Sequence, residues 1–317
     1  MLSNKTKLRT VGILVASLSP LMIASVASGD SSNNYGPFPV TVKGYDGSAT
    51  NSVSYSGQIA RHVLHDSLKK LASTGDGGSN AAAVEAEMMA YFAGSDKNKT
   101  IVSPASKDDY QIKQTLMNSL SKGKKLSNKS YKGVINGWPG QMTGPEVLEF
   151  MIKKAAMSKG GFDPLTGYNY PQLISKFAMG AVFYNQAVDG YLDEKLAADN
   201  KPNGKPYKAG KHYTGKEHVW DEAYGYWGAA AHSLNLSAKQ SYEVAKKKNF
   251  AISDANGDGV IDLKSEMTFA HAYYASSFDK GGKTNYLQTV SQAFLDGRKL
   301  ITSANGENLT DAQRAQL

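Results

Sequence analysis

The chain has 317 residues, of which 41% are hydrophobic and 20% charged, so it can fold around a sizeable core. It contains no cysteine, which excludes disulfides, thiolate metal sites and thiol nucleophiles. Its net charge of +8 is modest and spread along the sequence, so nucleic-acid binding is not indicated.

Residues 1–27 have the pattern of a secretory signal peptide. A basic start with Lys5, Lys7 and Arg9 precedes an apolar run that ends in small residues. Removal of this segment lowers the net charge to +5 and leaves no membrane span in the mature chain. Ser28 stands where a bacterial lipoprotein carries its lipidated cysteine. We therefore expect a protein exported to the periplasm or secreted, without a lipid anchor.

The rest of the sequence predicts an all-α fold. Residues 28–53 are rich in Gly, Ser, Asn and Pro and predict a flexible linker, whereas residues 54–317 read as one helical domain. Strand signals are absent, and the spacing suggests two packed bundles, over about 54–160 and 161–317. Apolar spacing and capping residues predict helices over 54–72, 80–92, 108–120, 144–158, 171–198, 217–232, 237–248, 263–279 and 285–304.

The stretch from Lys211 to Asn235 contains the densest group of candidate ligands. At about 100° per residue, His218, Asp221 and Glu222 fall on one side of a helix, with Gly225 among them. The opposite side is aromatic and is expected to be buried. Imidazole and carboxylate groups suit iron, and also copper or zinc, so this polar face is a candidate transition-metal site. The alternative is a solvated face of a core helix.

A second group of ligand-type residues lies on the first predicted helix. His62 and Asp66 are one helical turn apart, and His65 lies between them. These side chains can donate ligands to one ion, or they can form a surface charge pair. Helical bundles place metal sites between facing helices, so we expect His62, His65 or Asp66 to approach His218.

Residues 254–266 match a calcium loop of the EF-hand type. Ser265 departs from the pattern at the twelfth position, where a bidentate glutamate belongs, and Glu266 follows one residue later. The alternative is a turn that binds nothing. The expected ligands are Asp254, Asn256, Asp258, the carbonyl of Val260, Asp262 and Glu266.

Three phrases carry a family resemblance: residues 55–61 (YSGQIAR), 178–187 (AMGAVFYNQA) and 212–226 (HYTGKEHVWDEAYGY). They resemble a bacterial lipoprotein family, domain of unknown function 4856, which is distantly similar to imelysin. Imelysin-type proteins are exported helical double bundles with a Gly-x-His-x-x-Glu site implicated in iron uptake. The resemblance implies such a fold and such a role. In this chain Asp221 and Glu222 follow His218 by three and four residues, which departs from that spacing.

These observations predict an exported helical protein that binds a metal ion or metal complex, linked to iron uptake and to partners in the cell envelope. One alternative is a calcium-stabilised surface protein that binds glycans or proteins. The other is a metal-dependent hydrolase of peptides or envelope polymers, which needs three convergent ligands and an open position. The usual enzymatic motifs are missing, so a binding protein is favoured over an enzyme.

Overall fold

The structure, a computed structural model, describes residues 31–94, 98–197 and 200–317. The described chain is mainly helical, which confirms the all-α prediction. The predicted signal peptide, residues 1–27, lies outside the described residues. No helix in the described part of the chain has both the length and the apolar character to cross a membrane.

Most of the predicted helices are present, with a few changes in their bounds. The α-helices are α1 (Ser56–Leu71), α2 (Ala81–Phe92), α3 (Gly144–Met157), α4 (Tyr170–Ala178), α5 (Gly215–Trp227), α6 (Ala238–Ala245), α7 (Phe250–Ser253), α8 (Ala270–Asp279), α9 (Tyr286–Ser303) and α10 (Asp311–Arg314). A π-helix, η5 (Met179–Ala197), continues α4. The short 3-10 helices are η1 (Ser31–Asn33), η2 (Met117–Ser119), η3 (Ser127–Lys129), η4 (Lys159–Gly161) and η6 (Ser233–Asn235). The strands β1 (Phe162–Asp163) and β2 (Tyr168–Asn169) pair antiparallel.

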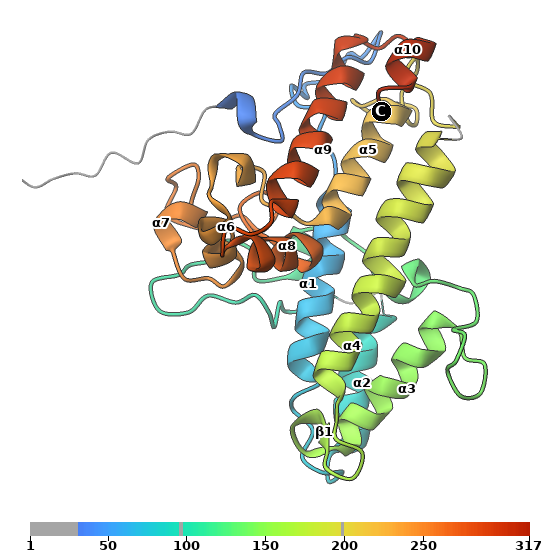
Figure 1. The fold of residues 1–317 in the computed structure, drawn as a ribbon, viewed down its shortest axis with the longest axis vertical. Helices are drawn as coiled ribbons and strands as arrows, with labels where there is room; N and C mark the ends of the chain where they lie inside the picture. The colour runs from blue at the N-terminus through green and yellow to red at the C-terminus, as the bar shows by residue number, and fades with distance from the viewer. Residues whose placement is uncertain (1–30, 95–97, 198–199) are drawn as a thin grey trace, which may run out of the picture.

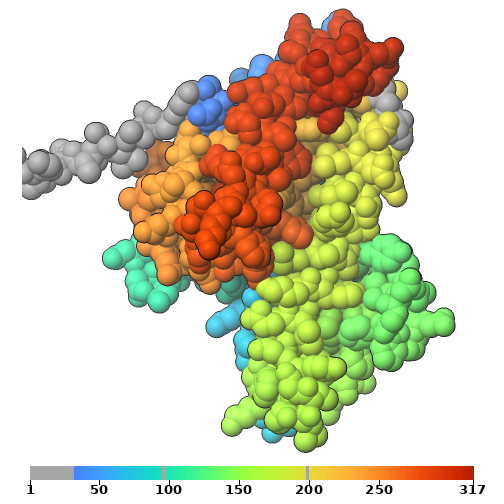
Figure 2. Space-filling view, viewed as in Figure 1, coloured from blue at the N-terminus to red at the C-terminus, as the bar shows by residue number. Residues whose placement is uncertain are grey.

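The long helices are arranged along the long axis of the molecule (Figure 1). Helix α1 packs against α2, α4 and α5, and α5 packs against η5, α1 and α9. Helices α6 to α8 lie to one side, and the β1–β2 hairpin and α10 lie at opposite ends. Figure 2 shows α4 and η5 as a continuous yellow-green surface beside the red C-terminal helices. The hydrophobic core is continuous between the predicted halves, since Leu64 and Met88 belong to the same cluster as Tyr224 and Phe269.

Helix α5 begins and ends at residues whose chemistry favours helix termini. The Thr214 hydroxyl accepts a hydrogen bond from the Glu217 amide at 3.1 Å, and the Glu217 carboxylate accepts one from the Thr214 amide at 2.8 Å. Gly228 ends the helix in the left-handed conformation, with φ of 83°. The helix is therefore shorter than predicted. Trp220 is buried, as expected, whereas Trp227 is only partly buried.

The predicted flexible linker over residues 28–53 is wrong for its described part, 31–53. The Tyr35 ring stacks on Tyr224 with centroids 3.5 Å apart, and its hydroxyl donates to Asp221 at 2.9 Å. Ser52 is fully buried and accepts a hydrogen bond from Arg298 at 2.6 Å. The segment is rich in small and polar residues, and this composition does not indicate that a few of its side chains are buried and hold it against α5 and α9.

Two predicted helices are also wrong, in whole or in part. Residues 108–120 contain only the short η2, because the segment forms isolated β-bridges, among them Ile112 with Ile261. The predicted helix over 263–279 begins only at Ala270. In both places apolar residues at near-helical spacing are buried by an extended or turning backbone, which periodicity alone does not distinguish.

Candidate functional site

The acidic residues of α5 face two different environments. Asp221 accepts hydrogen bonds from Arg298 Nε at 2.9 Å and from the Tyr35 hydroxyl at 2.9 Å, and its second oxygen accepts one from the Ser54 amide at 3.0 Å. Glu217 also pairs with Arg298, at 3.1 Å, and all three charged side chains are fully shielded from solvent or nearly so. Asp221 therefore belongs to a buried ion-pair network, and the predicted grouping of Asp221 with His218 as ligands of one metal is wrong.

His218 and Glu222 form a pair on the other side of α5. The Nε2 atom of His218 lies 3.7 Å from a carboxylate oxygen of Glu222, one helical turn away. The other oxygen of Glu222 accepts a hydrogen bond from Gln58 Nε2 at 2.7 Å. The imidazole packs against the rings of Tyr207 and Tyr213, whose centroids are 4.4 and 4.5 Å away. The pair is thus held in a defined position by α1 and by the loop before α5.

The protonation of His218 suits a metal ligand. Burial lowers the pKa of His218, and the nearby carboxylates of Glu222 and Asp221 oppose this shift only in part. The imidazole is therefore neutral at neutral pH and has a ring nitrogen lone pair to donate.

A pocket of about 500 Å³ opens beside this pair, and its walls are strongly cationic. They come from α1, the loop before and including η3, η5, the loop that precedes α5, and α5 itself. Glu222 is the one carboxylate among the described residues that line it. The cationic side chains are Arg61, Lys124, Lys129, Lys195, Lys201 and Lys211.

The positive charges in this pocket repel one another. Burial lowers the pKa of Lys129, and the charges of Arg61, Lys195 and Lys124 lower it further, while Glu222 raises it. Burial and the charge of Arg61 also lower the pKa of Lys124. These residues could not be recognised as a group from the sequence, because they come from segments far apart in the chain. The basic composition of residues 122–132 was a signal for one wall only.

Gly225 brings α1 and α5 close together at this site. A β-carbon at position 225 would lie 2.7 Å from the Cβ atom of Gln58 and 2.8 Å from that of Tyr55. The glycine therefore permits a close helix crossing. As a result, Gln58 reaches Glu222 and Arg61 reaches the same pocket.

The residues predicted on α1, His62, His65 and Asp66, do not reach His218. His62 is fully buried, and its Nε2 atom donates to the Gly225 carbonyl at 2.9 Å. Burial lowers the pKa of His62 to about 3, so the ring is neutral. Its orientation toward Gly225 makes it a packing residue of the α1–α5 crossing, and its predicted role as a metal ligand is not supported.

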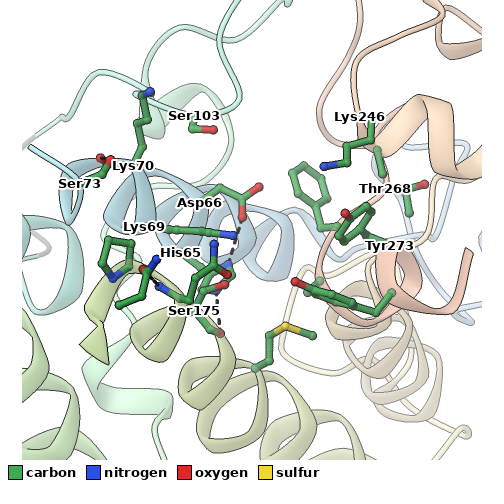
Figure 3. Close-up of a pocket in the computed structure, with 18 of the residues that line it drawn as sticks. His65, Asp66, Lys69, Lys70, Ser73, Ser103, Ser175, Lys246, Thr268 and Tyr273 are labelled. Carbon is green, nitrogen blue, oxygen red and sulfur yellow. Dashed lines mark hydrogen bonds and ion pairs between the residues drawn. The ribbon is translucent and has the colours of Figure 1, made fainter. Parts of the chain in front are cut away.

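His65 and Asp66 line a different and larger pocket, of about 710 Å³ (Figure 3). The two ring nitrogens of His65 lie 3.1 Å from Asp66 Oδ1 and 3.1 Å from the Ser175 carbonyl. Both nitrogens thus have protein partners. Lys69 and Lys70 of α1 and Lys246, directly after α6, also line this pocket, which is polar but does not include the His218–Glu222 pair.

The predicted calcium loop lies on the surface beside residues 111–114. Asp254 accepts hydrogen bonds from the amides of Gly257 and Gly259, both at 2.9 Å, and Asp258 accepts one from the Val260 amide at 3.1 Å. Asn256 similarly accepts one from the Asp258 amide at 2.8 Å. The side-chain oxygens at the first, third and fifth positions are thus gathered by the turn itself.

Three features of the loop differ from the pattern expected of an EF-hand. Glu266 is 3% exposed, and its carboxylate accepts hydrogen bonds from the amides of Ala255, Asn256 and Asp262, so it ties the two ends of the loop together. The flanking helices are also reduced, since α7 has four residues and a turn follows the loop. Finally, the Lys113 ammonium lies 3.7 Å from Asp258 and 3.6 Å from Asp262.

Within the described ranges, no three histidine or acidic side chains come close enough together to hold one metal ion. A family model described as a domain of unknown function (DUF4856) matches residues 151–314, just over half of the chain. This match includes the phrases at 178–187 and 212–226 that carried the resemblance. No curated protein and no solved structure matches the chain significantly.

Proposed function

We propose that this chain, which belongs to the family of domains of unknown function DUF4856, is an exported binding protein for a metal complex. The observation that carries the proposal is the His218–Glu222 pair at the wall of a 500 Å³ pocket. The volume is in the range of small-molecule sites. The link to iron uptake rests on the resemblance to imelysin-type proteins.

The number of donors favours a metal complex over a bare ion. His218 and Glu222 supply one imidazole and one carboxylate, and iron, copper and zinc each accept four or more ligands. The cationic walls also disfavour an uncompensated metal cation. A metal that brings its own chelator needs only the two open positions that this pair can fill. The protein groups would then recognise the exposed face of the chelated metal.

A chelate of low charge tests this role largely apart from the charge of the pocket. The 1:1 complex of ferric iron with nitrilotriacetate has a low net charge and keeps an open coordination position. Wild-type protein should bind it in isothermal titration calorimetry, and His218→Ala and Glu222→Gln should each weaken binding about tenfold or more. His212→Ala, outside the pair, is the control. Equal binding by all four proteins contradicts the proposal.

We also propose that the loop over residues 254–266 binds calcium as a structural ion. Asp254, Asn256, Asp258 and the Val260 carbonyl are oxygen donors of the type that calcium prefers. The ammonium of Lys113 is a cation placed between two of the expected carboxylate ligands, so a calcium ion there would compete with it. Glu266, which ties the loop ends, is no longer required as a direct ligand.

A further inference from the structure

The pocket beside His218 has many more positive than negative side chains, and this excess indicates the kind of ligand that it binds. Six cationic side chains line it against the single carboxylate of Glu222. Among the described residues, no ion pair joins Lys124, Lys129 or Lys195 to a carboxylate. The protein thus gathers like charges at one place, which costs free energy unless an anion compensates them.

Several of these cations are held in place rather than extended into solvent. Arg61 is 6% exposed, and its guanidinium donates to the carbonyls of Lys125 and Gly57, both at 3.2 Å. The Lys195 ammonium lies over the Tyr191 ring at 3.6 Å, and Tyr191 is itself buried. Lys124 crosses α1 at Gly57, where its Cε atom would lie 2.9 Å from an added β-carbon. A preorganised set of cations loses little entropy when it binds an anion.

The pocket offers two kinds of groups, which suit different parts of one ligand. The His218–Glu222 pair offers donor atoms for a metal, whereas the lysines and Arg61 offer hydrogen-bond donors for negatively charged oxygens. Tyr207 and Tyr213 pack against His218 and hold its ring in place. Such an arrangement fits a chelate that exposes part of its metal and also carries free oxyanion groups.

We propose that the pocket binds a small polyanion with several carboxylate or phosphate groups, either free or as the chelator of a metal. This inference rests on the proposed function for its metal, but the anion site stands on the cationic side chains alone. Because the attraction is electrostatic, affinity should fall as the salt concentration is raised and the Debye length shrinks toward about 10 Å.

The test uses metal-free protein and two probes, citrate and pyrophosphate, in calorimetric titrations at low salt. Wild-type protein should bind at least one of them, and Lys124→Gln/Lys195→Gln should weaken that binding about tenfold or more. Lys70→Gln/Lys246→Gln, which removes the same charge from the 710 Å³ pocket, is the matched control and should bind as wild type does. A preference for citrate or for pyrophosphate identifies the anionic group. Circular dichroism melting checks that each variant folds.

Three outcomes separate the two proposals. If neither probe binds, or if both double variants weaken binding equally, the polyanion site is overturned, whatever the result with ferric nitrilotriacetate. If His218→Ala binds free citrate as wild type does but loses the binding of ferric nitrilotriacetate, both proposals stand. If the probes bind through Lys124 and Lys195 while no variant at His218 or Glu222 affects any chelate, the anion site stands and the metal role fails.

Discussion

At the scale of single residues, Arg298 is the side chain that compensates two buried carboxylates. It pairs with Glu217 and Asp221 and also donates to Ser52, and its side chain is fully shielded from solvent. Removing one member of such a network leaves buried charges without compensation. The guanidinium therefore holds the N-terminal segment, α5 and α9 together.

We predict that Arg298→Met lowers the free energy of unfolding by about 3–5 kcal/mol in urea titrations. The adjacent exposed residue gives a control: Lys299→Met removes the same charge but should cost less than about 1 kcal/mol. Similar losses in the two variants would show that the network contributes little.

His62 makes a separate prediction about pH. Its pKa is about 3 in the folded protein because the ring is buried, against about 6.5 in an unfolded chain. Between these two pH values the unfolded state binds a proton that the folded state does not bind. The free energy of unfolding is therefore highest above pH 6.5 and falls as the pH drops toward 3. The slope reaches about 1.4 kcal/mol per pH unit for this proton.

His62→Gln keeps a donor for the Gly225 carbonyl but removes the titrating group. Unfolding free energies measured by urea from about pH 7 to about pH 4.5 should therefore fall less steeply in the variant than in wild type. Parallel pH profiles would contradict the assignment of His62 as a neutral core residue.

At the scale of elements, the crossing of α1 and α5 decides where the pocket lies. Gly225→Ala places a methyl group within 2.7 Å of Gln58 and should destabilise the fold by about 1–3 kcal/mol. Gly180→Ala on η5 is the control, since an added β-carbon meets nothing within 4 Å there. The midpoint of urea unfolding should be lower for Gly225→Ala than for Gly180→Ala. Equal midpoints would mean that the helix crossing accommodates the methyl group without losing stability.

The calcium loop is a second element with a direct test. Calcium at about a hundredfold excess over its dissociation constant should stabilise the wild-type protein by about 2.7 kcal/mol. Asp258→Ala should abolish this stabilisation, whereas Asp296→Ala, on the exposed face of α9, should keep it. Lys113→Met should strengthen calcium binding because the competing ammonium is gone. If calcium and chelator leave the melting temperature of wild type unchanged, the loop is only a turn.

The elements differ in how far their sequence could predict them. Helices α1, α3 and α9 were predicted to within two residues, because a regular apolar stripe and clear terminal residues agree there. The segment 108–120 was misassigned because residues such as Ile112 are buried in an extended backbone that bridges to Ile261, far along the chain, which local spacing does not reveal. The π-helical path of η5 also gave no recognisable sequence signal.

The candidate site was predicted in part. The helical projection correctly placed His218 and Glu222 together, but it could not separate Asp221 from them. Asp221 follows His218 by three residues and Glu222 follows it by four, and both spacings are close to one helical turn. What separates them is Arg298, which lies 77 residues later in the chain. Similarly, the partners of His62 and His65 are backbone carbonyls on α5 and α4, and only the packing of these helices reveals them.

At the scale of the whole molecule, the pocket forms only where segments far apart in the chain pack together. Its cations come from α1, from the loop around η3, from η5 and from the loop before α5, and the ligand pair comes from α5. No single stretch of sequence contains the site, so its function depends on the continuous core that joins these segments. We therefore predict one location for the metal and its chelator together.

The most direct measurement is anomalous diffraction from crystals of the protein soaked with ferric citrate. We predict an iron peak within bonding distance of His218 Nε2 and a Glu222 carboxylate oxygen, with the citrate oxygens directed toward Lys124, Lys129 and Lys195. An iron peak at any other position, or citrate density only in the pocket lined by Lys70 and Lys246, would contradict this prediction.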